Sequence, residues 1–134
     1  MNRYVADTQA LIWYMMESRK LSSKAARAFR DAEHGFVQIL VPSIVLVETA
    51  FIFARNRVPR DILDRVFALT DAADANLRVV PLDLAVAQAT RDFGPAAVPE
   101  LADRIIAATA RALDLPLLTA DPMIASSELV QVVW

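Results

Sequence analysis

Short runs of β-branched and aliphatic residues alternate along the chain with longer stretches in which apolar residues recur at helical spacing. The strand-like runs lie at residues 4–5, 39–41, 79–80, 117–118 and 130–133, and helical spacing covers residues 8–16, 23–33, 43–57, 60–73, 84–92 and 99–113. Such alternation indicates a parallel sheet, because each crossover between parallel strands requires a connection about as long as a helix. The pattern therefore predicts an α/β fold with a mostly parallel sheet of four or five strands.

A chain of 134 residues suffices for one compact core, whereas two domains would each be unusually small. The sequence contains no internal repeat, low-complexity segment or linker, so we predict a single domain over residues 1–134. Hydrophobic residues make up 56% of the chain, against roughly 45–50% in typical soluble domains. The surplus favours an additional apolar contact surface, and we expect a homodimer.

The most apolar window, residues 36–54, contains Gln38, Pro42 and Glu48. A charge well inside the window argues against a membrane span, and we predict a buried strand followed by a helix. Residues 10–16 are also apolar, but no small-residue cleavage site follows them, so no signal peptide is expected. We expect no membrane association.

Several residue types that are scarce or missing narrow the possible chemistry. The chain has no Cys, which excludes disulfides and thiolate chemistry and is compatible with a reducing cytoplasm, the location we expect. The single histidine, His34, excludes two-histidine acid–base pairs and His-rich metal clusters. Two isolated glycines, Gly35 and Gly94, cannot form a P-loop or a dinucleotide-binding turn. Carboxylates, hydroxyls and basic side chains remain, which points to hard metal ions or carboxylate pairs.

Two aspartates follow predicted strands directly. Asp7 comes after the first strand, and Asp121 comes shortly after the strand at residues 117–118. Because open parallel sheets place their ligands at the carboxyl ends of the strands, these two side chains are expected to share one edge of the sheet. Each is also a suitable N-cap for the helix that follows, so a purely structural role stays open for either one alone.

Two further acids lie on predicted helices. Glu48 is the lone charge in an apolar helix that we predict to be buried on nearly all sides, so it requires either an Arg partner or a place in a metal site. Asp103 lies in the first turns of the helix that begins near Pro99, one turn after Glu100. Glu100 and Asp103 also suit the positive end of that helix's dipole, so a purely structural role is the alternative for both.

Asp7, Glu48, Asp103 and Asp121 would form one acidic pocket if the sheet edge and the two helices meet. At an effective dielectric constant of about 20, two carboxylates ~4 Å apart repel each other by roughly 4 kcal/mol, so protonation or a bound cation must relieve the repulsion. Ligands that are all oxygen favour Mg²⁺, with Mn²⁺ as the alternative. We therefore predict that these four residues bind the metal and carry catalysis.

Basic residues gather in the first half of the chain. Residues 1–65 hold ten basic and seven acidic side chains, whereas residues 66–134 hold four basic and nine acidic ones. Twelve of the fourteen basic residues are Arg, whose planar guanidinium forms paired hydrogen bonds with phosphate. An ordinary solvated helix face is the alternative explanation. An acidic pocket in surroundings of this kind suits a phosphate-bearing polymer as substrate.

The segments around these acids also resemble the PIN-domain family. The resemblance covers about residues 3–134 and rests on Val5-Ala6-Asp7-Thr8, on Glu48, on Ala102-Asp103-Arg104-Ile105-Ile106-Ala107-Ala108-Thr109-Ala110 and on Leu117-Leu118-Thr119-Ala120-Asp121. The length of the chain and the order Asp, Glu, Asp, Asp are similar to the VapC toxins, the ribonuclease halves of bacterial toxin–antitoxin pairs. Many relatives carry a run like Asp-Pro-Phe-Asp-Arg where this chain has Glu100-Leu101-Ala102-Asp103-Arg104. This departure leaves the role of Glu100 open.

The resemblance implies a three-layer α/β/α sandwich and a Mg²⁺-dependent endoribonuclease that uses metal-activated water. Asp7 and Asp103 would be direct ligands, and Glu48 and Asp121 would act through water. It also implies an antitoxin partner bound near the acidic pocket. Thr8 and Thr119 resemble the small hydroxyl residues that flank the family's site, although both also suit ordinary capping and strand-end hydrogen bonds.

Two other functions are compatible with the sequence. A receiver-type phosphoryl-transfer domain also gathers acids around Mg²⁺ at strand ends, but Glu48 inside an apolar helix argues against it. A non-catalytic PIN-like module that binds RNA or protein is the second alternative, and the complete set of acids argues against it.

Overall fold

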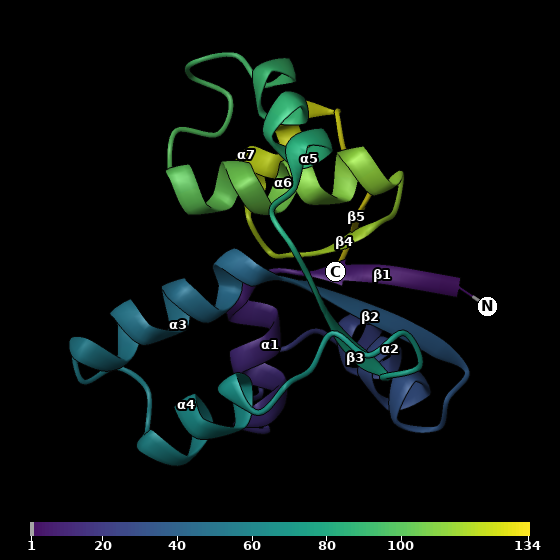
Figure 1. Ribbon diagram of the computed structural model, residues 1–134, viewed down its shortest axis with the longest axis vertical. Coiled ribbons are helices and arrows are strands. Elements are labelled where there is room, and N and C mark those ends of the chain that lie inside the picture. Colours follow the sequence, from purple (N-terminus) through teal and green to yellow (C-terminus); the bar gives the residue numbers. More distant parts are fainter. Residues whose placement is uncertain (1) are drawn as a thin grey trace.

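The computed structural model describes residues 2–134, in which strands and helices alternate as predicted (Figure 1). The elements are, in order, β1 (Asn2–Ala6), α1 (Thr8–Met15), α2 (Ser23–Glu33), β2 (Val37–Pro42), α3 (Ser43–Ala54), α4 (Arg60–Phe67), β3 (Leu77–Val80), α5 (Leu84–Ala89), the short 3-10 helix η1 (Thr90–Asp92), α6 (Leu101–Leu113), β4 (Leu117–Leu118), α7 (Pro122–Ser127) and β5 (Val132–Val133). No helix in residues 2–134 has the length and apolar character needed to span a membrane.

The five strands form one sheet in the order β3-β2-β1-β4-β5, and every pairing is parallel. The prediction of an α/β fold with a largely parallel sheet is therefore confirmed. The chain builds the sheet outward from β1 in one direction through β2 and β3, and then adds β4 and β5 on the other side of β1. Figure 1 shows this division, with α1 to α4 on one side of β1 and α5 to α7 on the other. Such a reversal of strand order leaves a crevice at the carboxyl ends of β1 and β4.

The middle of the sheet is covered on both faces. Val5 and Ala6 of β1, Ile39, Leu40 and Val41 of β2, and Leu117 and Leu118 of β4 all have exposed fractions of 1% or less. They belong to one cluster of buried apolar side chains. Side chains of both orientations are buried because helices pack on each face, as is usual for parallel sheets. The carboxyl ends of β1 and β4 are thus anchored in the fully buried middle of the sheet.

Two predicted helices end earlier than expected. The helix predicted for residues 43–57 ends at Ala54, because Asn56 adopts a left-handed conformation with φ of 58° that stops a helix. The helix predicted for residues 60–73 ends at Phe67, because Thr70 forms a parallel bridge to Arg78 beside β3. The short helix α7 follows Asp121, where a helix was expected without a stated range.

The prediction that the helix carrying Glu48 is buried on nearly all sides is wrong. Only Val45 and Thr49 of α3 are fully buried. Val47 and Phe51 are 49% and 65% exposed, because only one face of α3 packs onto the rest of the chain. The uniform hydrophobicity of the segment therefore marks one buried face and one exposed apolar face.

Candidate functional site

The four predicted acids line one cavity of about 360 Å³ at the crevice between β1 and β4. They come from four separate parts of the chain: the end of β1, the middle of α3, the first turn of α6 and the loop after β4. The other lining residues are Thr8, Gln9, Trp13 and Ala120. The fold thus brings together Asp7, Glu48, Asp103 and Asp121, and their catalytic and metal-binding roles stay a prediction.

Asp7 and Asp121 each cap the helix that follows a strand. Asp7 Oδ1 accepts a hydrogen bond of 2.8 Å from the Ala10 N–H at the start of α1, and Asp121 Oδ1 accepts one of 2.8 Å from the Met123 N–H at the start of α7. The backbone N–H of Asp7 also donates to the Leu118 carbonyl, which holds the end of β1 against the end of β4. Each cap bond uses one carboxylate oxygen, so both residues combine the capping role with a place in the cavity wall.

Glu48 is held by a hydroxyl and not by an arginine. The Thr8 hydroxyl donates a hydrogen bond to Glu48 Oε1 across the interface between α1 and α3. The only ion pairs among residues 2–134 are Arg60 with Asp64 and Arg111 with Asp92, so the alternative that Glu48 forms a salt bridge is wrong for the described chain. Thr8 is itself buried, which fixes the position of its hydroxyl. The Thr8 side chain therefore orients one oxygen of Glu48.

The carboxyl groups of the cavity disfavour one another's charge. Burial raises the pKa of Asp7 to about 6, although hydrogen bonds with Thr119 and the Ala10 N–H lower it, and the charges of Glu48 and Asp121 raise it further. Burial also raises the pKa of Asp103 to about 6, followed by repulsion from Glu48, Asp121, Asp7 and Glu100. Both shifts have the sign expected for carboxylates that are partly removed from water and close to like charges.

The position of Asp103 depends on its neighbour Arg104. The Arg104 guanidinium donates three hydrogen bonds to backbone carbonyls: Nε to Val98 at 2.9 Å, Nη1 to Phe93 at 3.1 Å and Nη2 to Gly94 at 2.9 Å. These bonds hold the irregular loop before α6 against the first turn of that helix. Arg104 is therefore a structural determinant of the site that the sequence pattern alone did not reveal.

The donor set of the cavity suits a hard cation. All four titratable side chains that line it are carboxylates, and neither Lys nor Arg is among its lining residues. In the part of the chain that the structure describes, no group of three or more carboxylate or imidazole side chains is close enough to hold one ion as it stands. Mg²⁺ usually keeps several waters and takes only one or two protein carboxylates, so this arrangement fits an ion bound by two residues and water.

Three cavity residues were not predicted as site residues. Gln9 and Trp13 lie one helical turn apart on α1, and Ala120 precedes Asp121. Gln9 and Trp13 are four residues apart in a helix that Asp7 caps, and this spacing places them on the same face. Glu100 lies outside the lining and is exposed, and its charge reaches the site through its effect on Asp103.

Comparison with known proteins agrees with this architecture. The sequence model of the PIN domain family matches residues 4–127. Among solved structures, the DNA-bound VapBC of Salmonella typhimurium matches with a TM-score of 0.70 and 16% identity, covering 99% of this chain and 98% of that one. The promoter-DNA-bound VapBC2 of Rickettsia felis matches with a TM-score of 0.68 and 14% identity, covering 98% and 97%. A toxin–antitoxin complex of Klebsiella pneumoniae matches with a TM-score of 0.64 and 20% identity, covering 98% and 96%. No curated protein sequence matches the chain.

Proposed function

Because the chain belongs to the PIN-domain family, we propose that it is a Mg²⁺-dependent endoribonuclease and the toxin of a toxin–antitoxin pair. The observation that carries the proposal is the convergence of four carboxylates from four elements on one cavity that contains no basic side chain. The structural likeness to chains of VapBC and toxin–antitoxin complexes supports the same choice. An all-parallel sheet alone would not, because many unrelated functions share such folds.

Asp7 and Asp103 are the residues that would hold the ion, since a cation relieves the repulsion that raises the pKa of both groups. When bound, Mg²⁺ or Mn²⁺ supplies Lewis-acid activation of water and neutralises charge on the transferring phosphate. Glu48, oriented by Thr8, would accept the proton of the attacking water, and Asp121, which follows the neighbouring strand β4, would assist. The cleaved bond is the one to the 3′ oxygen, which leaves a 5′-phosphate and a 3′-hydroxyl.

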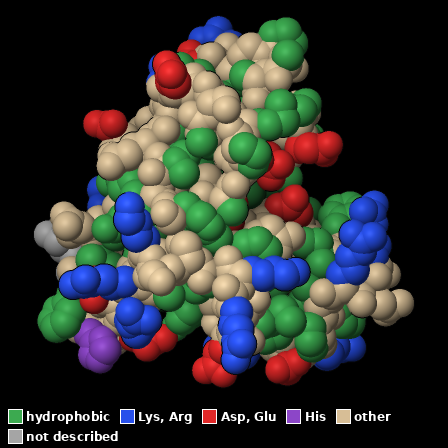
Figure 2. Space-filling view, turned by 180° about the vertical axis from the view of Figure 1, so that it is seen from behind, with side chains coloured by type: hydrophobic (Ala, Val, Ile, Leu, Met, Phe, Trp, Pro, Cys, Tyr) green, Lys and Arg blue, Asp and Glu red, His purple; other side chains and the backbone are tan. Residues whose placement is uncertain are grey.

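Exposed Arg side chains at the end of the helix that carries Glu48 and in the segment after it would bind the RNA backbone. Arg55, Arg57 and Arg60 are exposed around the connection between α3 and α4. On the face of the molecule drawn in Figure 2, the Lys and Arg side chains gather mainly over the lower part. Phosphates held there by charge-assisted hydrogen bonds give affinity without base selectivity. We place this activity in the cytoplasm, a compartment compatible with a chain that has no Cys.

The deciding experiment measures RNA cleavage by the purified chain with and without Mg²⁺. We expect EDTA to stop cleavage, and Asp7→Asn or Asp103→Asn to lower the rate by on the order of 100-fold or more. Asp83→Asn is the matched control, because Asp83 caps α5 through the same type of bond, to the Val86 N–H, outside the cavity. Cleavage that survives EDTA, or products with 2′,3′-cyclic phosphate ends, would contradict the mechanism. Stable phosphorylation of Asp7 by a small phosphodonor without RNA cleavage would favour the receiver-type alternative.

We propose that the exposed apolar face of α3 forms a homodimer contact. Val47 and Phe51 lie one turn apart on this face, and Phe67 of the neighbouring α4 is 52% exposed. Large exposed apolar side chains on neighbouring helices are a usual mark of a protein interface. Sedimentation should show that Phe51→Glu converts dimers to monomers, whereas Phe36→Glu, at a residue that is 69% exposed after α2, should leave the dimer intact.

An antitoxin is the second partner that we propose. Its amphipathic segment would fill a groove beside α3, apart from the face given to the homodimer, while its Arg or Lys side chain reaches Asp7 and Asp103. Because that cation and Mg²⁺ would compete for the same carboxylates, excess Mg²⁺ should weaken inhibition of RNA cleavage by the product of the adjacent gene. An adjacent-gene product that neither binds nor inhibits would contradict the toxin assignment and leave the nuclease chemistry to its own test.

A further inference from the structure

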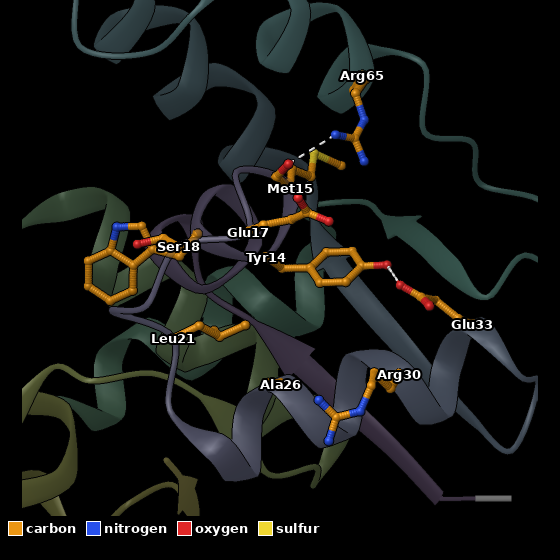
Figure 3. Close-up of a pocket in the computed structure, with 10 residues that line it drawn as sticks. Tyr14, Met15, Glu17, Ser18, Leu21, Ala26, Arg30, Glu33 and Arg65 are labelled. Atoms are coloured by element: carbon orange, nitrogen blue, oxygen red, sulfur yellow. Dashed lines mark hydrogen bonds between the residues drawn. The ribbon is translucent and has the colours of Figure 1, made fainter.

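A second and larger cavity, of about 620 Å³, lies beside the acidic one. Trp13 lines both cavities, so the indole stands at the boundary between them. The second cavity is walled by the end of α1, the turn that follows it, α2 and one side chain of α4 (Figure 3). None of the four acids of the candidate site lines it, so its chemistry requires a separate explanation.

The Trp13 ring is held in position and yet remains accessible. Its centroid lies 5.9 Å from that of Trp134, with the two planes tilted by 55°, and Lys20 Nζ lies 5.9 Å from the ring centroid. The side chain is only partly buried. A partly exposed indole that lies beside a second, tilted indole, with a cation over its ring, resembles the aromatic surfaces on which nucleic-acid bases stack.

The polar groups of the second cavity include both donors and acceptors. Arg65 Nη1 donates to the Met15 carbonyl at 3.0 Å, and the Tyr14 hydroxyl donates to Glu33 (Figure 3). Arg30 and Arg65 form no ion pair with any residue in 2–134. The guanidinium groups of Arg30 and Arg65 can donate hydrogen bonds, and the carboxylates of the same cavity can accept them. Together they match the edge of a base, which carries both donors and acceptors, whereas a phosphate would use only the donors.

The distance along α1 relates the two cavities. Asp7 and Trp13 are six residues apart, which corresponds to about 9 Å along a helix axis. This separation is short enough for one or two nucleotides of a strand whose backbone passes the acidic cavity. A base inside a duplex could not enter a walled cavity of this kind without leaving its stack.

We propose that Trp13 and the adjoining cavity form a subsite for one unpaired base of a single-stranded RNA substrate, near the phosphodiester bond that is cleaved. The base stacks on the Trp13 indole and turns its edge toward Arg30 and Arg65. This inference rests on the proposed function for the identity of the polymer as RNA. It assigns to Trp13 a contact with a base next to the cleaved bond, which the four carboxylates alone would not supply.

The test measures RNA binding separately from cleavage, in an Asp103→Asn background that does not cleave. A short fluorescent single-stranded oligoribonucleotide is titrated with this protein and with versions that also carry Trp13→Leu or Trp13→Phe. Leucine keeps apolar volume and lacks an aromatic face, so Trp13→Leu should weaken binding by about 5- to 100-fold. Trp13→Phe should recover most of the affinity. Replacing bases one at a time with abasic ribose should identify one position at which the loss of affinity does not add to that of Trp13→Leu.

A fluorescence measurement keeps the proposal testable if Trp13→Leu does not fold. The chain has two Trp residues, so Trp134→Phe leaves Trp13 as the only indole. Single-stranded RNA should quench its emission at saturation, and fully paired RNA should not. Unchanged emission, equal affinity of the Trp13→Leu protein, or an equal loss of affinity for paired RNA would overturn the subsite. If the protein cleaves RNA independently of Trp13, the nuclease proposal stands and the subsite fails. If RNA binding depends on Trp13 but the parent chain cleaves no RNA, only the subsite stands.

Discussion

The two cavities that share Trp13 handle charge in opposite ways. In the acidic cavity every titratable lining side chain is a carboxylate, and burial with mutual repulsion raises the pKa of Asp7 and Asp103 to about 6. In the neighbouring cavity, Arg30 and Arg65 lie among carboxylates such as Glu33, which accepts a hydrogen bond from Tyr14. Repulsion among like charges therefore disfavours the first cavity without a cation, while the second contains side chains of both charges. A strained set of like charges suits ion binding, and a balanced set suits recognition of a neutral polar group.

The largest effect expected on stability comes from removing one charge from the acidic cavity. Asp7→Asn should stabilise the metal-free protein at pH 8 by about 1–2 kcal/mol, allowing for partial exposure, because the raised pKa marks an unfavourable charge and Asn keeps the helix cap. The melting temperature should rise by about 3–8 °C. Asp83→Asn, which alters a comparable cap at α5, should give no such rise. A clear loss of stability in Asp7→Asn would show that Asp7 acts mainly as a structural cap.

The pH dependence of stability should follow the same charges. A carboxyl group whose pKa is raised in the folded state makes a contribution that is complete below its unfolded pKa, 3.8 for Asp7, and that is lost as pH rises through the folded value of about 6. The metal-free parent should therefore lose stability between these values, and Asp7→Asn should flatten the profile. Denaturant titrations at several pH values measure both slopes.

Addition of Mg²⁺ above pH 6 should recover about 1 kcal/mol of stability in the parent at roughly ten times the dissociation constant. Asp7→Asn should respond less, because it lacks one of the proposed ligands. Melting temperatures with and without Mg²⁺, at constant ionic strength, give the comparison. An equal response of both proteins would argue that the ion binds elsewhere.

The smallest effect is expected in the second cavity. Burial and the neighbouring Glu33 raise the pKa of Tyr14 to about 12. The stability associated with its neutral phenol is therefore complete below the ordinary tyrosine pKa of 10.0 and is lost as pH approaches 12. Tyr14→Phe should cost about 0.5–1 kcal/mol at neutral pH through loss of the bond to Glu33. It should leave the response to Mg²⁺ unchanged. In an alkaline titration of the parent protein, the phenolate of Tyr14 should form at the highest pH. That last rise in absorbance should be missing from Tyr14→Phe.

Local sequence patterns were enough to locate most of the acidic cavity. Asp7 and Asp121 could be placed at one sheet edge because a strand followed by an N-cap is a local signal, and parallel strands bring such positions together. Glu48 stood out through its contrast with an apolar segment. The family motif and the order of acids were also visible before the structure, because they depend on residue identity and spacing.

Contacts between distant segments decided the rest. The hydroxyl of Thr8, rather than an arginine, contacts Glu48, and three backbone carbonyls accept hydrogen bonds from Arg104. Only packing determines which face of α3 is exposed, because a segment that is apolar on every side has no periodicity to indicate it. The same holds for Trp13, whose spacing in the sequence allows a place in the core, at an interface or in a cavity. The position of α1 beside two cavities is fixed by its contacts with α2 and α3. Local free energies select helices and strands, whereas the burial of each side chain is settled only when those elements meet.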